Sequence, residues 1–500
     1  MNFQERVLPG RSSGATWIWL AATAYFVFNA LTLGLASPTA DLDQAQQLVL
    51  SQDLSLGYGA QPPLYTWLVN LLFSITGPDR LVLLAFKALL LSALVLGVLK
   101  AGRELGFDAR QQVLLVMGLA LIPSLIWEAQ RDLTHTVLAT VISAWTLWSL
   151  FRLHRTGSWM SYLLFGLLAG LGLLSKYNFG VFLAALLLAA FSMPGFRQRL
   201  FSPRVLVSLA LVGLITLPHF LWAMGHADQA LASQHKFEIQ ERAFFAGIWA
   251  VVLASLAFLG PLLLAYGLSW RPGVAARIAG APDSGGAFLL RLLLVLLALL
   301  PILVIASGTT HVKDRWLQPL LFFVPMLLVM RGIAKPRVFM GIGVLMMLVT
   351  ALLLPGRTLW ASWTGAAKRP HLPYVQMGAA LRTTAGVPDV IISPQELLAG
   401  NMRLVFPDAR IEVVESKMAL RDRLRHYAKR NVLFITDNGG LAGKAGYSNP
   451  YPDVFKGNAL SGLDWPLLYV PAMKHRVYWA AIKSDSRLGP SPGINRNAAP

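Results

Sequence analysis

A loop between two apolar segments, residues 40–64, gathers three carboxylates in a strongly basic chain. Asp41, Asp43 and Asp53 lie in this loop, which contains no lysine or arginine, although the chain has a formal net charge of +19. We expect Asp43 to lie in the first turn of a short helix over residues 41–53, where the helix dipole favours an ionised carboxylate. Such a group can accept a proton from a reacting hydroxyl, so Asp43 is the candidate general base.

Two other interpretations of this loop are open. The helix could be an ordinary amphipathic surface helix with acidic residues in its first turn. If the helix is displaced by two residues along the sequence, Asp41 takes the place of Asp43. Asp53 is expected only to be exposed to solvent.

Polar and charged residues also gather at the ends of later apolar segments. They form four groups, at residues 128–135, 175–178, 226–242 and 310–316. Ionisable groups near a membrane core are costly, and they usually pair with each other or contact a substrate. Together, the four groups favour a site for an anionic, lipid-linked substrate. Solvent exposure is the simpler explanation for Arg80, His226 and Arg242, and a local ion pair is the simpler one for Arg131 and Asp132.

The segments that must position these groups are predicted to cross a membrane. Hydrophobic residues make up 55% of the chain and charged residues 13%, and a soluble protein has about twice that charged share. We expect a mostly α-helical, polytopic membrane domain over residues 1–355. Eleven crossings are expected, at residues 16–36, 81–100, 112–127, 134–151, 159–174, 179–193, 205–223, 244–266, 288–306, 316–330 and 338–355. The apolar segment 63–76 is shorter and is expected to be an interfacial helix that begins at Pro62-Pro63.

The distribution of positive charge predicts the orientation of these crossings. With the N-terminus inside, the cytoplasmic connections hold about twice as many lysines and arginines as the outer ones. Arg6 and Arg11 precede the first segment without a clear cleavage site after it, which indicates an uncleaved signal anchor. The aspartate loop and everything after residue 355 are then expected on the outer face. This distribution explains the basic charge without a nucleic-acid partner.

The last part of the chain has a different composition and is expected to form a soluble α/β domain over residues 356–488. Short β-rich runs occur at 390–392, 411–414, 432–436, 467–470 and 477–480, and helical stretches at 374–385 and 416–429 alternate with the first three. Asn438-Gly439-Gly440 lacks the spacing of a dinucleotide-binding motif and is expected to be a turn. The tail at 489–500 is rich in Pro, Gly, Ser and Asn, which predicts disorder. The chain contains no cysteine, so it forms no disulfide.

The order of these motifs resembles one family of bacterial membrane enzymes. Asp43-Gln44-Ala45, Gly57-Tyr58 and Gln61-Pro62-Pro63-Leu64 are similar to the first periplasmic loop of protein mannosyltransferase-like glycosyltransferases, a group that includes lipid A aminoarabinose and galacturonate transferases. Further matches follow in the same order: Arg131-Asp132-Leu133, Ser175-Lys176-Tyr177, Leu221-Trp222-Ala223 with the polar stretch to Glu238, and His311 to Trp316. The resemblance covers about residues 16–355, and the order and spacing of the motifs carry it.

The resemblance implies the GT-C fold, with about eleven transmembrane helices and a periplasmic C-terminal domain. It also implies transfer of a sugar, with inversion, from a polyprenyl-phosphate donor to lipid A, another envelope glycan or a protein. The reaction would take place at the periplasmic face of the bacterial inner membrane, among membrane lipids.

The resemblance also assigns roles to individual residues. Asp43 would be the general base, and Asp132 would orient a substrate or help to hold a divalent ion. Lys176 and Arg131 would bind the departing phosphate, followed by Lys313 and Arg315. The expected substrate-binding set also includes Tyr58, Gln61, Tyr177 and His311.

Two positions depart from the family pattern. Gln44 stands where the family has Glu, and Gln61 stands where it has His before Pro-Pro. Two aspartates alone make a weak zinc site, so no metal and no other cofactor is predicted. The changes are compatible with a different sugar or with an inactive site.

Two other functions are open from the sequence. A transporter or flippase of a lipid-linked envelope precursor would also use charges within the membrane. It should show charges in the middle of helices and two matching halves, and neither is evident here. A catalytically inactive relative that acts as a scaffold would share the fold.

Overall fold

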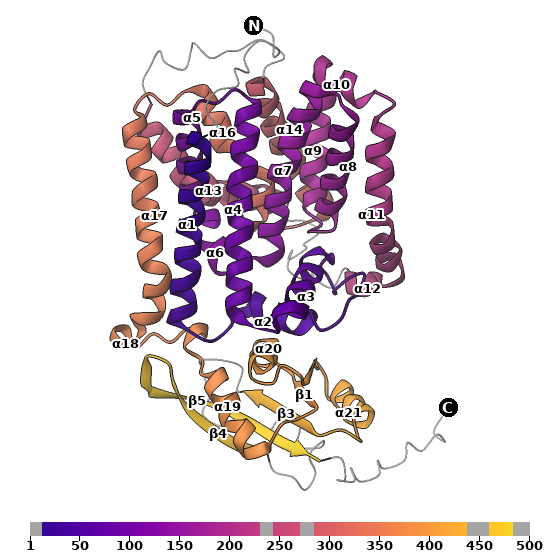
Figure 1. The fold of residues 1–500 in the computed structure, drawn as a ribbon, viewed down its shortest axis with the longest axis vertical. Helices are drawn as coiled ribbons and strands as arrows, with labels where there is room; N and C mark the ends of the chain where they lie inside the picture. The colour runs from indigo at the N-terminus through magenta and orange to yellow at the C-terminus, as the bar shows by residue number, and fades with distance from the viewer. Residues whose placement is uncertain (1–12, 231–243, 271–284, 438–459, 484–500) are drawn as a thin grey trace. The chain divides into compact units, whose positions relative to one another are not determined.

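The chain forms two compact units (Figure 1). The structure is a computed structural model that describes residues 13–230, 244–270, 285–437 and 460–483. The membrane unit contains Met1–Ser37 and Asp53–Trp360, and the C-terminal unit contains Pro38–Gln52 and Ala361–Pro500. The sequence predicted a boundary at residue 355 and did not indicate that residues 38–52 belong with the C-terminal part.

The membrane unit is a bundle of helices (Figure 1). Its helices are α1 (Ser13–Ala36), α3 (Leu64–Thr76), α4 (Arg80–Glu104), α5 (Ala109–Ala120), α6 (Ala129–Arg131), α7 (Thr134–Thr156), α8 (Trp159–Leu173), α9 (Phe179–Phe191), α10 (Pro194–Leu200), α11 (Val205–Gly225), α12 (Ala227–Ala230), α13 (Phe244–Leu268), α14 (Gly285–Ser307), α15 (Gln318–Leu321), α16 (Val324–Arg331) and α17 (Pro336–Leu359). A π-helical turn, Ser124–Glu128, precedes α6, and a 3-10 turn, Asp314–Leu317, precedes α15.

The expected number of eleven crossings is not confirmed. Within the described residues, seven helices are long and apolar enough to cross a membrane: α1, α4, α7, α11, α13, α14 and α17. Two bent pairs would raise this number to nine, because α5 meets the segment Ser124–Arg131 at 79° and α9 meets α10 at 115°. A proline lies at each bend, Pro123 and Pro194, where it removes a helical hydrogen bond. The predicted crossing at 316–330 is divided between α15 and α16, which both have a proline near their first residue.

Helices α4 and α7 lie in the interior of this bundle and position the polar residues discussed below. Of their most apolar stretches, 67% of α4 and 83% of α7 is buried. Helix α4 packs against both α1 and α7. The hydroxyls of Thr140 and Thr146 in α7 donate to carbonyls one turn earlier, Thr136 and Ile142. These local bonds satisfy hydroxyls that cannot reach water inside a membrane.

The C-terminal unit contains one mixed five-stranded sheet with the order β2-β1-β3-β5-β4. Its strands are β1 (Val390–Ser393), β2 (Arg410–Val413), β3 (Val432–Asp437), β4 (Ser461–Leu467) and β5 (Val470–Ile482). β1 pairs in parallel with β2 and β3, and β5 pairs antiparallel with β3 and β4. The predicted strand at 467–470 is wrong: β4 ends at Leu467 and β5 begins at Val470, with Tyr469 in the turn at φ 62°.

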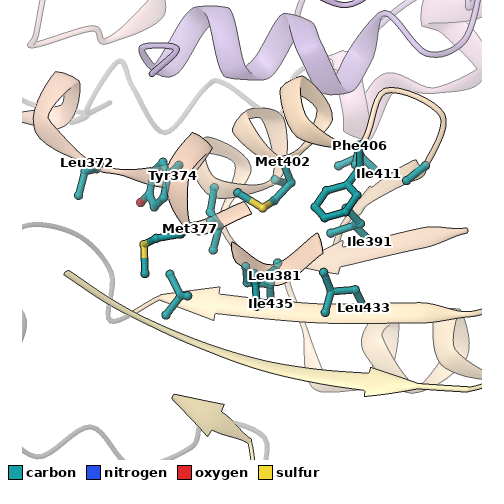
Figure 2. Close-up of a cluster of buried hydrophobic side chains, with 14 of the residues drawn as sticks. Leu372, Tyr374, Met377, Leu381, Ile391, Met402, Phe406, Ile411, Leu433 and Ile435 are labelled. Carbon is teal, nitrogen blue, oxygen red and sulfur yellow. The ribbon is translucent and has the colours of Figure 1, made fainter. Parts of the chain in front are cut away.

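Helices cover both faces of this sheet. They are α2 (Leu42–Leu50), α18 (Ala361–Thr364), α19 (Tyr374–Ala385), α20 (Glu396–Val405) and α21 (Lys417–His426). One hydrophobic cluster joins α19 and α20 to one face, where Met377 and Met402 lie near Ile391, Ile411 and Leu433 (Figure 2). A second cluster joins Leu420 and Leu424 of α21 to alternate strand residues, such as Ile392 and Phe434, on the other face. The two predicted helices are present, α20 was not predicted, and the expected turn at 438–440 and the tail lie outside the described residues.

Candidate functional site

Asp132 lies at a sharp turn between α6 and α7 in the membrane unit. Its backbone is extended, and the next residue, Leu133, is left-handed at φ 68°. A buried leucine in this conformation costs roughly 1–2 kcal/mol, and such strain persists only where surrounding contacts hold it. The first turn of α7 follows at once, with His135 and Thr136 buried. The turn therefore holds a carboxylate, an imidazole and two hydroxyls within five consecutive residues.

Two lysines from other parts of the membrane unit converge on this turn. Lys87 Nζ, from the interior of α4, donates to the backbone carbonyl of Asp132 at 2.5 Å. Lys176 Nζ, from the short connection between α8 and α9, donates to the Thr136 hydroxyl at 2.5 Å. Lys87 is only 2% exposed, whereas Lys176 is half-buried. Two positive charges thus lie against the Asp132–Thr136 turn.

The late polar loop lies beside the same region. The Gln318 side-chain amide donates to the Ser124 carbonyl at 2.7 Å and to its hydroxyl at 2.8 Å. The Asn178 amide donates to the Trp316 carbonyl at 2.9 Å. These bonds tie the loop before α15 to the π-helical turn on one side and to the Lys176 loop on the other. The groups at 128–135, 175–178 and 310–316 are therefore neighbours, although they lie far apart in the sequence.

A cluster of opposite charges accompanies these bonds. Glu128 interacts electrostatically with Asp314, Arg315 and Arg131. All four side chains are half-buried, so part of each remains accessible from outside the bundle. Arg131 thus has an acidic neighbour, Glu128, in addition to the adjacent Asp132.

The second half of the first loop, residues 53–63, packs against this group through α11. The Leu56 carbonyl is 2.7 Å from His219 Nδ1, and the Tyr177 hydroxyl is 3.3 Å from His219 Nε2. Gly57 lies so close to Trp222 that a Cβ would be 2.0 Å from the indole ring. Tyr177 and His219 are stacked at 5.9 Å. The turn, the Lys176 loop and α11 therefore form one packed wall.

Tyr58 and Gln61 close the turn itself. Their backbones exchange hydrogen bonds of 3.1 and 3.2 Å around Gly59, which has φ 58°. The Tyr58 hydroxyl donates to the Asp53 carbonyl at 2.5 Å and accepts from the Ser55 amide at 2.9 Å. Burial raises the pKa of this hydroxyl above its ordinary value of 10.0. These bonds show that Tyr58 stabilises the loop. The Gln61 side chain is half-buried and accessible.

The first half of the loop forms α2, in the C-terminal unit. Asp43 lies in its first turn, as predicted, and is half-buried. Asp41 is the N-cap: its Oδ1 accepts from the Leu42 amide at 2.9 Å, and it lies 3.7 Å from Arg369. Gln44, 3% exposed, completes a capping box by accepting from the Asp41 amide at 3.3 Å. Gln44 therefore does at this helix end what a glutamate would do, without a buried charge.

The remaining predicted residues have less specific surroundings. His311 is exposed, and Lys313 is half-buried just before the 3-10 turn. Arg80 donates to the carbonyls of Leu33 and Ser37 at the end of α1, so it serves a helix end rather than a substrate. The predicted loop at 226–242 lies mostly outside the described residues.

Sequence reasoning missed Lys87, Thr136 and His219. Lys87 is surrounded by apolar residues in the sequence, and a lysine in the middle of a crossing is itself the signal that could have revealed it. Among the residues that the structure describes, no group of three or more histidine, aspartate or glutamate side chains is arranged to hold a metal ion.

Comparison with known proteins gives consistent results. Residues 60–222 match the family described as dolichyl-phosphate-mannose-protein mannosyltransferase. The chain is 34% identical over 416 residues to the lipopolysaccharide core galacturonosyltransferase RgtB of Rhizobium johnstonii, covering 79% of this chain and 82% of that protein. It is 30% identical over 411 residues to RgtA of the same organism, covering 79% and 81%.

A solved structure has a similar fold. The crystal structure of ArnT from Cupriavidus metallidurans bound to undecaprenyl phosphate aligns with a TM-score of 0.63. The alignment covers 94% of this chain and 98% of that chain, at 12% sequence identity. The likeness extends over both the membrane unit and the C-terminal unit.

Proposed function

Because the chain belongs to the family of membrane glycosyltransferases that contains the two lipopolysaccharide core galacturonosyltransferases, we propose that it transfers a uronic acid to an envelope glycolipid. The GT-C fold and the glycosyltransferase class expected from the sequence are confirmed. The proposed donor is a polyprenyl-phosphate-linked galacturonate, and the proposed acceptor is the lipopolysaccharide core at the periplasmic face of the inner membrane. Family membership supports a glycosyltransferase over a transporter.

The observation that carries this proposal is the convergence of Lys87 and Lys176 on the Asp132–Thr136 turn. A polyprenyl phosphate is a single anionic group on an apolar tail, which matches positive charge at the end of an apolar bundle. Charge-assisted contacts to phosphate are about twice as strong as neutral hydrogen bonds. We assign the phosphate to these lysines, and assign Arg131 and Arg315 to the remaining negative charge of the donor or acceptor.

The proposed reaction is a single inverting displacement. The acceptor hydroxyl attacks the anomeric carbon, and its proton passes to the Asp43 carboxylate. The bond between that carbon and the phosphate oxygen breaks, and the polyprenyl phosphate leaves with the electron pair. The lysines stabilise the charge that develops on the leaving oxygen. Asp132 orients the sugar through its carboxylate.

A transfer assay with the purified protein tests the proposal. The donor is polyprenyl-phosphate galacturonate, with aminoarabinose and hexose donors in parallel, and the acceptor is a lipopolysaccharide core fraction. Asp43→Asn should lower turnover by about 10²–10⁴-fold, the usual contribution of a general base. Asp53→Asn is the matched control, because Asp53 is an exposed aspartate of the same loop. Turnover by Asp43→Asn equal to that of the control would disprove the assignment of the base.

A further inference from the structure

Helix α2, which carries Asp43, packs closely against α20 inside the C-terminal unit. Gly400 of α20 lies against the backbone of Ala45 in α2, where an added Cβ would be 2.2 Å from the Ala45 carbonyl oxygen. Ala45 is completely buried. Two helix backbones approach this closely only where one residue has no side chain. Any larger residue at position 400 must therefore displace α2.

The N-terminal end of α2 is held by the residue next to Gly400. The Asn401 side-chain oxygen accepts from the Ala40 amide at 2.8 Å, and its amide donates to the Ala40 carbonyl at 3.2 Å and to the Leu397 carbonyl at 2.8 Å. Asn401 and Ala40 are both 0% exposed. Loss of this side chain would leave a buried backbone amide and carbonyl without partners, which is more costly than the loss of an exposed bond.

The C-terminal end of α2 is held by Arg403. Its guanidinium donates to the Leu48 carbonyl and, at 3.0 Å, to the Ser51 hydroxyl, and only 9% of the residue is exposed. The last carbonyls of a helix have no partner within the helix and carry partial negative charge. A buried arginine donates hydrogen bonds to them and neutralises that charge.

Helix α20 is itself fixed in the core. Met402 points into the hydrophobic cluster beside Phe406 and Met377 (Figure 2), and Leu398 and Ala399 belong to the same cluster. The partly buried Val49 of α2 packs against that cluster as well. Helix α2 is therefore built into the C-terminal unit, although the sequence places it between the first two apolar segments.

We propose that Gly400, Asn401 and Arg403 are positioning residues for sugar transfer, because they set the place and direction of the helix that carries Asp43. This inference rests on the proposed function. Misplacing a reacting group by about 1 Å can lower a rate by roughly 100-fold, so small displacements of α2 should be measurable. The C-terminal unit then has a direct part in the reaction through one buried helix face.

Paired variants test the proposal. Asn401→Leu and Arg403→Met remove the bonds to α2, whereas Asn401→Gln keeps an amide that can donate and accept, and Arg403→Lys keeps a positive charge. Turnover and the donor KM are measured for each. We expect the first pair to lower kcat by about 10–100-fold with the donor KM changed less than about threefold, and the conservative pair to recover most of the loss. Arg382→Met, an exposed arginine at the end of α19, is the control for changes within the C-terminal unit.

A second measurement reports the position of α2 without using activity. Because the chain has no cysteine, Ala45→Cys introduces a single thiol under α20. Maleimide should label it slowly in the parent chain and faster when Asn401→Leu or Arg403→Met is added, while the melting temperature of the membrane unit is unchanged. If Ala45→Cys itself lowers turnover, Val49→Cys takes its place.

The outcomes separate this inference from the assignment of the base. Faster labelling with unchanged kcat, or lower kcat with unchanged labelling, would overturn the positioning role. If the α20 variants lose kcat and expose the thiol but Asp43→Asn keeps full turnover, the positioning role stands and another α2 residue accepts the proton.

Discussion

The ammonium group of Lys87, in the interior of α4, binds the backbone carbonyl of Asp132 at 2.5 Å, 45 residues further along the chain. This bond joins α4 to the turn before α7, and these two helices are the most buried of the described helices that are long enough to cross a membrane. Lys87 is only 2% exposed, and a positive charge in such a buried place acts more strongly on a nearby phosphate than the same charge in water.

Replacing Lys87 with methionine keeps the length and packing of the side chain and removes its charge. We expect Lys87→Met to lower kcat/KM for the lipid-linked donor by about 10–100-fold, because one charge-assisted contact with the leaving phosphate is lost. Lys100→Met is the control, since Lys100 lies near the other end of α4 against the Trp148 ring. Equal activity of the two variants would show that Lys87 serves only packing.

The bond between Lys176 and Thr136 permits a second comparison. Lys176→Gln should raise the donor KM and lower turnover, because the positive charge is lost. Thr136→Val removes only the hydroxyl that accepts from Lys176, so the charge stays and the effect should be smaller, about 2–10-fold. Steady-state kinetics over a series of donor concentrations separate the two effects. A larger loss for Thr136→Val than for Lys176→Gln would contradict the phosphate-binding role of the lysine.

Chelation should leave turnover unchanged. The described part of the chain has no cluster of three ligating side chains, and Gln44 is occupied in the capping box of α2. We therefore expect EDTA to change kcat by less than twofold. Magnesium or zinc is then added back, and kcat is measured again. A loss that a divalent ion restores would assign Asp132 or Asp43 to a metal instead.

The C-terminal unit should lose stability at high pH through Tyr374. Burial, followed by the charge of Asp437 and the hydrogen bond to it at 2.5 Å, raises the pKa of the Tyr374 hydroxyl well above its ordinary value of 10.0. The folded state therefore keeps this proton at a pH at which the unfolded chain has lost it. The stabilising contribution is complete below about pH 10 and is lost as pH rises toward the folded pKa.

Tyr374→Phe measures this contribution. At neutral pH the variant should unfold more easily by about 1–3 kcal/mol, because the buried Asp437 carboxylate loses a donor. Above about pH 10 the difference from the parent should shrink. Unfolding of the C-terminal unit followed by tryptophan fluorescence across pH gives both values. A difference that is constant with pH would contradict the raised pKa.

Local features of the sequence predicted the local structure well. Helix capping predicts the first-turn position of Asp43, and proline geometry predicts the start of α3 after Pro62-Pro63. The ends of the apolar runs predict the three short polar turns. These signals depend on neighbours within a few residues. The polar turns at 128–135, 175–178 and 310–316 were expected to contribute to one site, because each lies at the end of an apolar segment.

The features that were missed depend on distant contacts. Lys87 is hidden in a continuous apolar run, and its partner lies on another helix. The expected eleven crossings are not confirmed, and a bend at Pro123 divides the segment that was expected to cross at residues 112–127. The membership of α2 in the C-terminal unit depends on Gly400, Asn401 and Arg403, and no local pattern in either segment indicates that they meet.

The place of α2 has a consequence for the synthesis of this protein. Arg403 and the Leu48 carbonyl that it binds are 355 residues apart in the chain. Translation proceeds at about 5–20 residues per second, so α20 is made roughly 20–70 seconds after α2 has left the ribosome. During that time the aspartate helix lacks its packing surface. A chain that ends before Gly400, Asn401 and Arg403 therefore lacks the contacts that hold α2, and we expect it to have no transfer activity.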